Sequence, residues 1–226
     1  MLELRNRPRG IFLKLPSTEI VDVVHASPLD FAVVDLEHSQ LSEGQARALV
    51  RHGAALGLPV LVRLPELDKG LVNRLLEAGA AGIQLSTVRR VEQIAGLRSA
   101  VAYAPAGTRS VSLAHPQAGY GGTPLAEYLA GVAAPLVVAQ IETADTDDPL
   151  DELMAAGPDV AFIGTTDLSV DVGLDASRVR ARVEEIAEAA AAAGVALGAF
   201  ALEDERVAYR LVSSDLTLLR AAIAHA

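Results

Sequence analysis

Short apolar stretches alternate with longer amphipathic ones along the whole chain. The short stretches are rich in Val, Ile and Leu, which is typical of strands that are buried on both faces of a parallel sheet. We therefore predict eight strands, at Ile11–Leu15, Phe31–Leu36, Val60–Leu64, Gly82–Ser86, Leu136–Ile141, Val160–Gly164, Ala196–Ala201 and Leu216–Leu219.

Helical periodicity fills most of the intervals between these strands. Strands that are joined through helices run parallel, and eight such units in 226 residues favour a closed (β/α)8 TIM barrel over an open doubly wound sheet. No linker or low-complexity segment divides the chain, so we expect a single domain over residues 1–226. The predicted helices include Ser42–Leu56, Lys69–Ala78, Val88–Ala100 and Ala176–Ala193.

One segment, Tyr103–Thr123, interrupts this alternation of predicted strands and helices. It is rich in Gly and Pro and only weakly periodic. An irregular connection of this length in a compact domain is usually functional or disordered. We expect parts of it to cover the mouth of the barrel.

The composition narrows the class of protein. Half of the residues are apolar, but there are four Phe, four Tyr and no Trp, so the core must be aliphatic. The formal charge of −10 argues against a nucleic-acid surface, which needs basic clusters. The absence of Cys excludes disulfides and thiolate metal sites. No apolar run approaches the roughly 18 residues of a membrane span, and we expect a soluble, cytoplasmic protein.

Two of the predicted strands run directly into an acidic residue. Glu142 follows the strand Leu136–Ile141, and Asp167 comes shortly after Val160–Gly164. A helical crossover between these strands would make them parallel neighbours, with both acids at the same edge. Two carboxylates at such an edge can share a hard divalent cation such as Mg²⁺ or Mn²⁺. The alternative is that they are ordinary helix-capping or loop acids.

Other polar residues lie at the ends of neighbouring strands. Alternation places Asp35 and Glu37 on one face of their strand, and His38 next to them is a candidate general base tuned by Asp35. Arg63 lies within an apolar strand and requires an anionic partner, either a substrate or a core acid in a structural ion pair. Lys14 offers a less favoured alternative, a Schiff-base mechanism.

Six short motifs occur in order between about Gly10 and Gly173. Their residues and order resemble the HpcH/HpaI aldolase family of class II, metal-dependent pyruvate aldolases, which also includes citrate lyase beta subunit-like proteins. The motifs are Asp35-Leu-Glu-His38, Val62-Arg63-Leu-Pro65, Glu77-Ala-Gly79-Ala, Tyr103-Ala-Pro-Ala-Gly107-Thr-Arg109, Gln140-Ile-Glu142-Thr and Phe162-Ile-Gly164-Thr-Thr-Asp167-Leu-Ser169.

The resemblance implies a reaction and a metal site. The reaction is cleavage or formation of the C–C bond of a 4-hydroxy-2-oxo acid through a pyruvate enolate. Glu142 and Asp167 match the family's metal ligands, and Gln140 matches a neighbour of the metal site. The implied metal is Mg²⁺ or Mn²⁺, with Co²⁺ as an alternative.

The resemblance also implies the residues that act on the substrate. Arg63 matches the arginine that holds the pyruvate oxygens and stabilises the enolate. His38 and Asp35 match a base dyad, and Glu77 matches an acid near the proton-transfer path. Backbone amides near Thr165 and Thr166 would hold the pyruvate carboxylate. The implied partners are a 2-oxo acid, an aldehyde and further copies of the chain in a homo-oligomer.

The sequence departs from the family pattern at three places. The usual Gly-Pro-Ala-Asp is Gly164-Thr-Thr-Asp167, and the usual Gly-Val-Gly is Ser110-Val-Ser112. The predicted last strand reads Leu-Leu-Arg220-Ala, and the chain stops at Ala226, so we expect the family's C-terminal helix, which packs onto a neighbouring subunit in relatives, to be missing. Two alternatives therefore stay open: an acyl-CoA lyase of the citrate lyase branch, and an inactive barrel that serves as a binding subunit.

Overall fold

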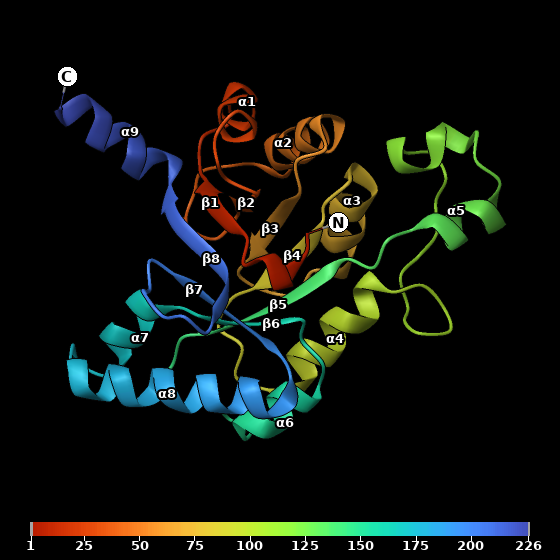
Figure 1. Ribbon diagram of the computed structural model, residues 1–226. Coiled ribbons are helices and arrows are strands. Elements are labelled where there is room, and N and C mark those ends of the chain that lie inside the picture. Colours follow the sequence, from red (N-terminus) through yellow and green to blue (C-terminus); the bar gives the residue numbers. More distant parts are fainter. Residues whose placement is uncertain (1, 226) are drawn as a thin grey trace.

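The computed structural model describes residues 2–225 and contains a closed barrel of eight parallel strands (Figure 1). Each strand pairs with its neighbour in the sequence, and β8 closes the barrel against β1. The predicted (β/α)8 TIM barrel is therefore confirmed. The strands are β1 (Arg9–Leu13), β2 (Phe31–Asp35), β3 (Val60–Leu64), β4 (Gly82–Leu85), β5 (Leu136–Ile141), β6 (Val160–Ile163), β7 (Ala196–Phe200) and β8 (Val207–Ser214).

Helices follow every strand except β7, which leads to β8 without a helix, and most of them cover the outside of the barrel (Figure 1). Several begin at a side-chain cap that their sequence contains, such as Ser42, which forms a capping box with Gln45. The helices are α1 (Glu19–His25), α2 (Glu43–Leu56), α3 (Lys69–Ala78), α4 (Val91–Val101), α5 (Leu125–Gly131), α6 (Leu150–Ala155), α7 (Thr165–Asp171), α8 (Ala176–Ala193) and α9 (Asp215–Ala224), with the 3-10 turns η1 (Leu4–Asn6) and η2 (Pro116–Gly121).

The buried apolar residues form two clusters on either side of the strands. The larger one, almost entirely aliphatic, fills the layer between strands and helices. The smaller one contains alternate strand residues, including Phe31, Phe162 and Tyr209, and fills the barrel interior. Gly198 leaves room for one of these rings, because a Cβ at this position would lie only 2.9 Å from the Phe162 ring. All four Phe side chains and Tyr209 are thus used where a wide interior must be filled.

The last strand was predicted in the wrong place. Leu216–Leu219 lies in α9, and β8 is Val207–Ser214, which alternates buried and half-buried residues. The apolar run at Leu216–Leu219 suggests a strand, but Ser214 caps a helix there by accepting a hydrogen bond from the Thr217 backbone N–H at 3.2 Å. The expectation of a missing C-terminal helix is corrected at the same time, because α9 follows β8 and projects away from the barrel (Figure 1).

The segment Tyr103–Thr123 does not cover the mouth. It follows α4 and leads through η2 and α5 to the start of β5, so both of its ends lie at the amino-terminal side of the strands. Gln117 packs against Gly79 at the end of α3, and Figure 1 shows η2 and α5 standing out from the barrel. The expectation was wrong because the loops at the mouth are those that lead from a strand to the next helix. A connection that leads from a helix to the next strand lies at the opposite, amino-terminal end of the barrel.

No helix between residues 2 and 225 is long and apolar enough to cross a membrane.

Candidate functional site at the carboxyl ends of the strands

The strand ends bring four polar residues together with the loops that follow. Asp35 is the last residue of β2, Arg63 the fourth residue of β3, and Gln140 the fifth residue of β5, directly before Ile141 and Glu142. All four are buried, with exposed fractions of 0% for Asp35, 6% for Arg63, 1% for Gln140 and 4% for Glu142. Such buried polar groups require partners, and each has them in the structure.

Asp35 and Arg63 form a bidentate ion pair. Arg63 Nε donates to Asp35 Oδ1 at 2.9 Å, and Nη2 donates to Oδ2 at 2.6 Å. Lys14 Nζ lies 3.0 Å from the same Oδ2. The third guanidinium nitrogen of Arg63, Nη1, lies 3.2 Å from Glu37 Oε2, and the guanidinium stacks over the Phe12 ring at 4.4 Å. Arg63 is therefore fixed on three sides.

These contacts determine the charge state of Asp35. Burial alone would raise the pKa of Asp35, but the hydrogen bonds and the charge of Arg63 outweigh burial and lower this pKa to about 2. The backbone N–H groups of Glu37 and His38 also donate to Asp35 Oδ1, at 3.1 Å each. Asp35 is thus an anion at neutral pH, and it holds Arg63 and the start of the loop after β2.

The imidazole of His38 is directed to Glu37. Nε2 of His38 lies 3.7 Å from Glu37 Oε2, whereas the hydrogen bond between His38 and Asp35 comes from the His38 backbone N–H. Glu37 is held in turn by Ser86 Oγ, which donates to Oε2 at 2.6 Å. The predicted pairing of the His38 and Asp35 side chains is not what the structure contains, because the lone pairs of Asp35 are taken by Arg63, Lys14 and two backbone N–H groups.

Glu142 is held by a row of hydrogen bonds across neighbouring strands. Thr87, in the loop after β4, donates to Glu142 Oε1 from its backbone N at 2.8 Å and from Oγ1 at 2.7 Å. Gln140 Nε2 donates to Glu142 Oε2, and Gln84 Nε2 donates to Gln140 Oε1 at 2.6 Å. Burial nevertheless raises the pKa of Glu142, although these hydrogen bonds work in the opposite direction. A nearby cation would favour the ionised carboxylate.

Glu142 and Asp167 line the same cavity. Asp167 belongs to α7, which starts directly after β6, and its side chain is exposed. The two acids share a cavity of about 280 Å³ with Glu37 and His38. An adjoining cavity of about 270 Å³ is lined by Arg63 and Gln140 and also by Thr165, Thr166, His38 and Asp167. The structure therefore brings together all the predicted site residues except Glu77, with Asp35 directly beneath Arg63.

The oxygen donors of this cavity fit a hard divalent cation. Residues 2–225 contain no cluster of three or more His, Asp, Glu or Cys side chains that could hold a metal ion by themselves. A site with two carboxylates, Glu142 and Asp167, leaves several coordination positions for water and substrate oxygens. That donor set matches the coordination of Mg²⁺, which keeps several waters and takes one or two carboxylates.

Glu77 lies outside these cavities. It is near the end of α3, where Asn73 Nδ2 donates to Glu77 Oε1 at 3.2 Å. The helix α3 runs back from the mouth towards the amino-terminal side of the barrel, so a residue in its last turn is carried away from the strand ends. The structure does not bring Glu77 to the site of its own chain.

Sequence reasoning did not identify every residue of the site. Lys14 was considered only as a Schiff-base former, yet it is an ionic partner of Asp35. Glu37 was placed on the same strand face as Asp35 without a role, yet it contacts both Arg63 and His38. The roles of Thr87 and Gln84 could not be predicted from the sequence, because their contacts with Glu142 and Gln140 depend on the register of β4 against β5.

Comparison with known proteins agrees with this arrangement. The family model described as HpcH/HpaI aldolase/citrate lyase matches residues 9–214. The chain is 32% identical over 197 residues to a hydroxypyruvate/pyruvate aldolase of Rhizorhabdus wittichii, covering 84% of this chain and 77% of that protein. It is 33% identical over 196 residues to a 4-hydroxy-4-methyl-2-oxoglutarate aldolase of Hapsidospora irregularis, covering 83% and 72%.

A solved structure has the same fold over almost the whole chain. The crystal structure of an HpcH/HpaI aldolase from Desulfitobacterium hafniense DCB-2 superimposes with a TM-score of 0.87 at 27% identity, covering 96% of this chain and 90% of that one.

Proposed function

The chain belongs to the HpcH/HpaI aldolase/citrate lyase family, and from this premise we propose that it is a divalent-metal-dependent aldolase that cleaves or forms the C–C bond of 4-hydroxy-2-oxo acids. Its relatives are named as aldolases, which are carbon–carbon lyases. The observation that carries the proposal is the shared cavity of Glu142 and Asp167, which adjoins the cavity lined by Arg63.

Arg63 supplies a fixed positive charge where negative charge develops on the 2-oxo oxygen of pyruvate. Its guanidinium is oriented before the substrate arrives, because Asp35 and Glu37 hold three of its nitrogens. A donor that is oriented in advance needs no reorganisation during the reaction, and removing one such group typically costs about 3–4 kcal/mol of barrier. In this proposal Asp35 is a positioning residue that acts through Arg63.

The substrate carboxylate is placed by α7. Thr165 and Thr166 line the cavity next to Asp167, so that their backbone N–H groups are available to carboxylate oxygens. Gln140 lines this cavity too, and it donates to Glu142, which lines the adjoining cavity together with Asp167. These groups would fix the 2-oxo acid with its reactive carbon between Arg63 and His38.

His38 is the proposed base. Its exposed imidazole lines both cavities, and in its neutral form it can take the proton from the 4-hydroxyl group during cleavage. Glu37 Oε2, 3.7 Å from Nε2, orients the ring. We assign no step to Glu77, because it lies outside the cavities.

Glu142 and Asp167 would hold Mg²⁺ or Mn²⁺, with Co²⁺ as an alternative. The bound cation would act as a Lewis acid on the 2-oxo and carboxylate oxygens of the substrate. Thr87 and Gln140 fix the orientation of Glu142 for this task, as outer-shell partners of ligands generally do.

Aldol activity with pyruvate and a panel of aldehydes, measured with Mg²⁺ or Mn²⁺ and with EDTA, tests the proposal. We expect EDTA to abolish the activity, and Glu142→Gln and Asp167→Asn each to lower kcat/KM by at least about a hundredfold. The matched control is Glu152→Gln in α6, a residue that lines neither cavity at the mouth, which should keep the wild-type rate. Unchanged activity in EDTA, or in either cavity variant, would contradict the metal mechanism.

The two other candidate functions make different predictions. An acyl-CoA lyase needs cations for the phosphates of CoA, but the Lys and Arg side chains that line the two cavities, Lys14 and Arg63, are both paired with Asp35. Tight saturable binding of an acyl-CoA would favour that function. A binding subunit without catalysis would give no metal-dependent binding of pyruvate or oxalate in calorimetry.

Two expectations complete the proposal. We propose a cytoplasmic protein made of one barrel domain, which is consistent with the absence of Cys in the 226 residues. We also propose a homo-oligomer with no nucleic-acid or membrane partner, consistent with the formal charge of −10.

A further inference from the structure

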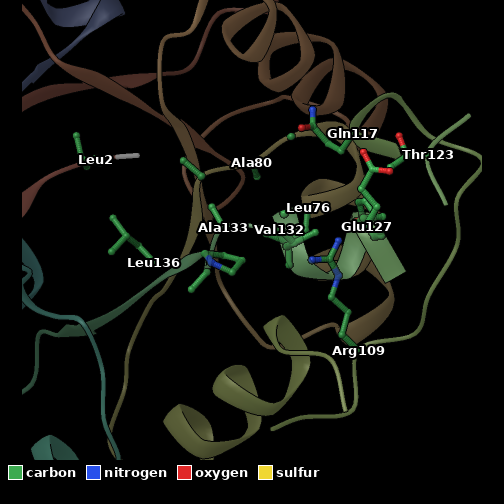
Figure 2. A pocket seen from close by; sticks show the side chains of 16 residues that line it. Leu2, Leu76, Ala80, Arg109, Gln117, Thr123, Glu127, Val132, Ala133 and Leu136 are labelled. Carbon is green, nitrogen blue, oxygen red and sulfur yellow. The ribbon is translucent and has the colours of Figure 1, made fainter. Parts of the chain in front are cut away.

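A cavity of about 490 Å³ lies at the end of the barrel opposite the candidate active site. Its walls include Ala81, directly before β4, and Leu136, the first residue of β5, which mark the amino-terminal ends of those strands. The segment that joins α4 to β5 forms the other side (Figure 2). No residue lines both this cavity and either cavity at the mouth.

Arg109 is buried at this cavity, with 7% of its surface exposed. Figure 2 shows its guanidinium pointing into the space between α5 and the strand ends. Its Nε donates to Asn73 Oδ1 at 3.0 Å, and its guanidinium carbon lies 4.5 Å above the centre of the Tyr103 ring. Its two terminal nitrogens form no hydrogen bond or ion pair with any residue in the described range 2–225.

The charge of Arg109 is therefore only partly compensated by the protein. Among the described residues its nearest link to a carboxylate is indirect: Asn73 accepts from Arg109 and donates to Glu77 at 3.2 Å. A cation that is removed from water normally has an anionic partner, and stacking on a tyrosine ring replaces only part of that interaction. With Nε bonded to Asn73, the edge formed by the two terminal nitrogens stays free, and its two N–H groups match the two oxygens of a carboxylate.

The other walls determine what kind of anion fits. Leu76, Val132 and Leu136 give the cavity apolar walls, and Arg109 is its single cationic side chain. Glu127, exposed on α5, lines the same cavity and disfavours a second negative charge on a ligand. A monoanion with an apolar body suits these walls better than a doubly charged phosphate.

We propose that this cavity is a second binding site, which takes a small organic carboxylate whose carboxyl group pairs with Arg109 and whose apolar part lies against Leu76, Val132 and Leu136. The site is separate from the proposed catalytic mouth and does not depend on the reaction that takes place there.

Ligand-observed NMR by saturation transfer, with hexanoate as the probe and the full chain, tests this site. We expect saturable binding of hexanoate and at least about tenfold weaker binding of its neutral isostere hexanamide. Arg109→Met should weaken hexanoate binding by at least about tenfold, because the charged hydrogen bonds are lost. The matched control is Arg89→Met, which removes a surface arginine paired with Asp147 at 2.6 Å and should leave hexanoate binding unchanged.

Two further variants keep the test decisive if Arg109→Met does not fold. Ala133→Phe enlarges a side chain in the cavity wall while Arg109 itself is kept, and it should also abolish hexanoate binding. Glu127→Gln removes the competing negative charge and should strengthen the binding several-fold. Circular dichroism of each variant establishes that it is folded.

Three outcomes would overturn the proposal. The first is equal hexanoate binding by the wild type, Arg109→Met and Ala133→Phe, which would place the bound probe elsewhere. The second is weaker binding by a folded Glu127→Gln variant. The third is inorganic phosphate displacing hexanoate at equal or lower concentration, which would mean that the apolar walls contribute nothing.

Discussion

Asp35 is the residue on which the arrangement of the mouth depends most. A single buried carboxylate accepts from Arg63 and the loop after β2, and it pairs with Lys14. Buried charges of this kind are costly to break, because the remaining partner is left uncompensated. The same contacts that prepare Arg63 for a substrate therefore also contribute to the stability of the barrel.

This arrangement predicts a specific loss of stability in acid. The pKa of Asp35 falls from the ordinary 3.8 to about 2 on folding, so its contribution of about 2 kcal/mol is complete above pH 4 and lost as the pH falls from 4 towards 2. Urea unfolding at several pH values measures this loss. Asp35→Asn should be less stable at pH 6 and should lack this part of the acid dependence. An equal slope between pH 4 and pH 2 in both proteins would contradict the prediction.

Thr87 is predicted to matter through Glu142. Thr87→Ala removes the Oγ1 hydrogen bond to Glu142 Oε1 and should weaken metal affinity by about 10-fold to 100-fold, the usual range for outer-shell partners. Thr87→Ser keeps a hydroxyl group and should restore most of the affinity. Titration of activity with Mn²⁺ measures the change. Equal metal affinities of the Ala and Ser variants would show that the hydroxyl group does not position the ligand.

For single residues, the sequence predicted which side chains lie at the ends of the strands better than it predicted which side chains contact each other. The alternation of side chains and the ends of strands pointed to Asp35, Arg63 and Glu142, and all three lie at the carboxyl ends of strands. Their catalytic and metal-binding roles stay predictions. The pairing of His38 with Glu37 could not be predicted, because the sequence does not show which donors already occupy Asp35.

Among the elements, the junction between β6 and α7 places the tightest constraint on the site. The Glu142 side chain packs directly against Gly164, so that a Cβ at this position would overlap with the Glu142 Cβ and carboxylate. This contact explains why the strand and helix meet at a glycine, which leaves room for Glu142 in the cavity that it shares with Asp167.

Gly164→Ala should therefore displace the Glu142 carboxylate and lower kcat/KM by at least about tenfold, since a 1 Å misplacement can cost about a hundredfold. The matched control is Gly44→Ala on α2, where an added Cβ would lie 3.9 Å from Ser42 Oγ and alanine favours the helix. Thermal unfolding separates a local effect from misfolding. A fully active Gly164→Ala variant would contradict this account of the junction.

The elements themselves were largely predictable. Val60–Leu64 and Leu136–Ile141 were predicted with the bounds that the structure has, because continuous apolar runs of that length fit strands buried on both faces. The strand β8 was missed because half-buried polar residues such as Arg210 interrupt its pattern, while α9 presents a run of leucines. An apolar run that short does not distinguish a strand from a helix.

The whole molecule has an apolar helix that the barrel does not cover. On α9, Leu216, Leu218, Leu219 and Ile223 are exposed by 44% to 67%. Clustered exposure of large apolar side chains is unfavourable in water and usually marks an interaction surface. The helix α9 is therefore consistent with the proposed homo-oligomer.

The double variant Leu219→Glu, Ile223→Glu should shift the protein towards smaller assemblies, because it puts charges on this surface. Light scattering coupled to size-exclusion chromatography measures the mass. The matched control is Val23→Glu, at a residue of α1 that is 62% exposed, which should leave the mass of the assembly unchanged. A wild-type monomer at micromolar concentration would contradict the expected oligomer.

The glutamine row behind Glu142 offers a spectroscopic consequence. Gln84 Nε2 donates to Gln140 Oε1, and Gln140 Nε2 donates to Glu142 Oε2, so the two carboxamides point in a single direction that ends on Glu142. At the start of the row, Gln84 Oε1 accepts no hydrogen bond from the described residues 2–225. Their side-chain ¹⁵N–¹H₂ resonances should exchange slowly with solvent, because both side chains are buried. A cation that draws electron density from Oε2 would change the chemical shifts of the Gln140 side chain most and those of Gln84 less. These two signals would therefore report metal binding without any measurement of catalytic activity.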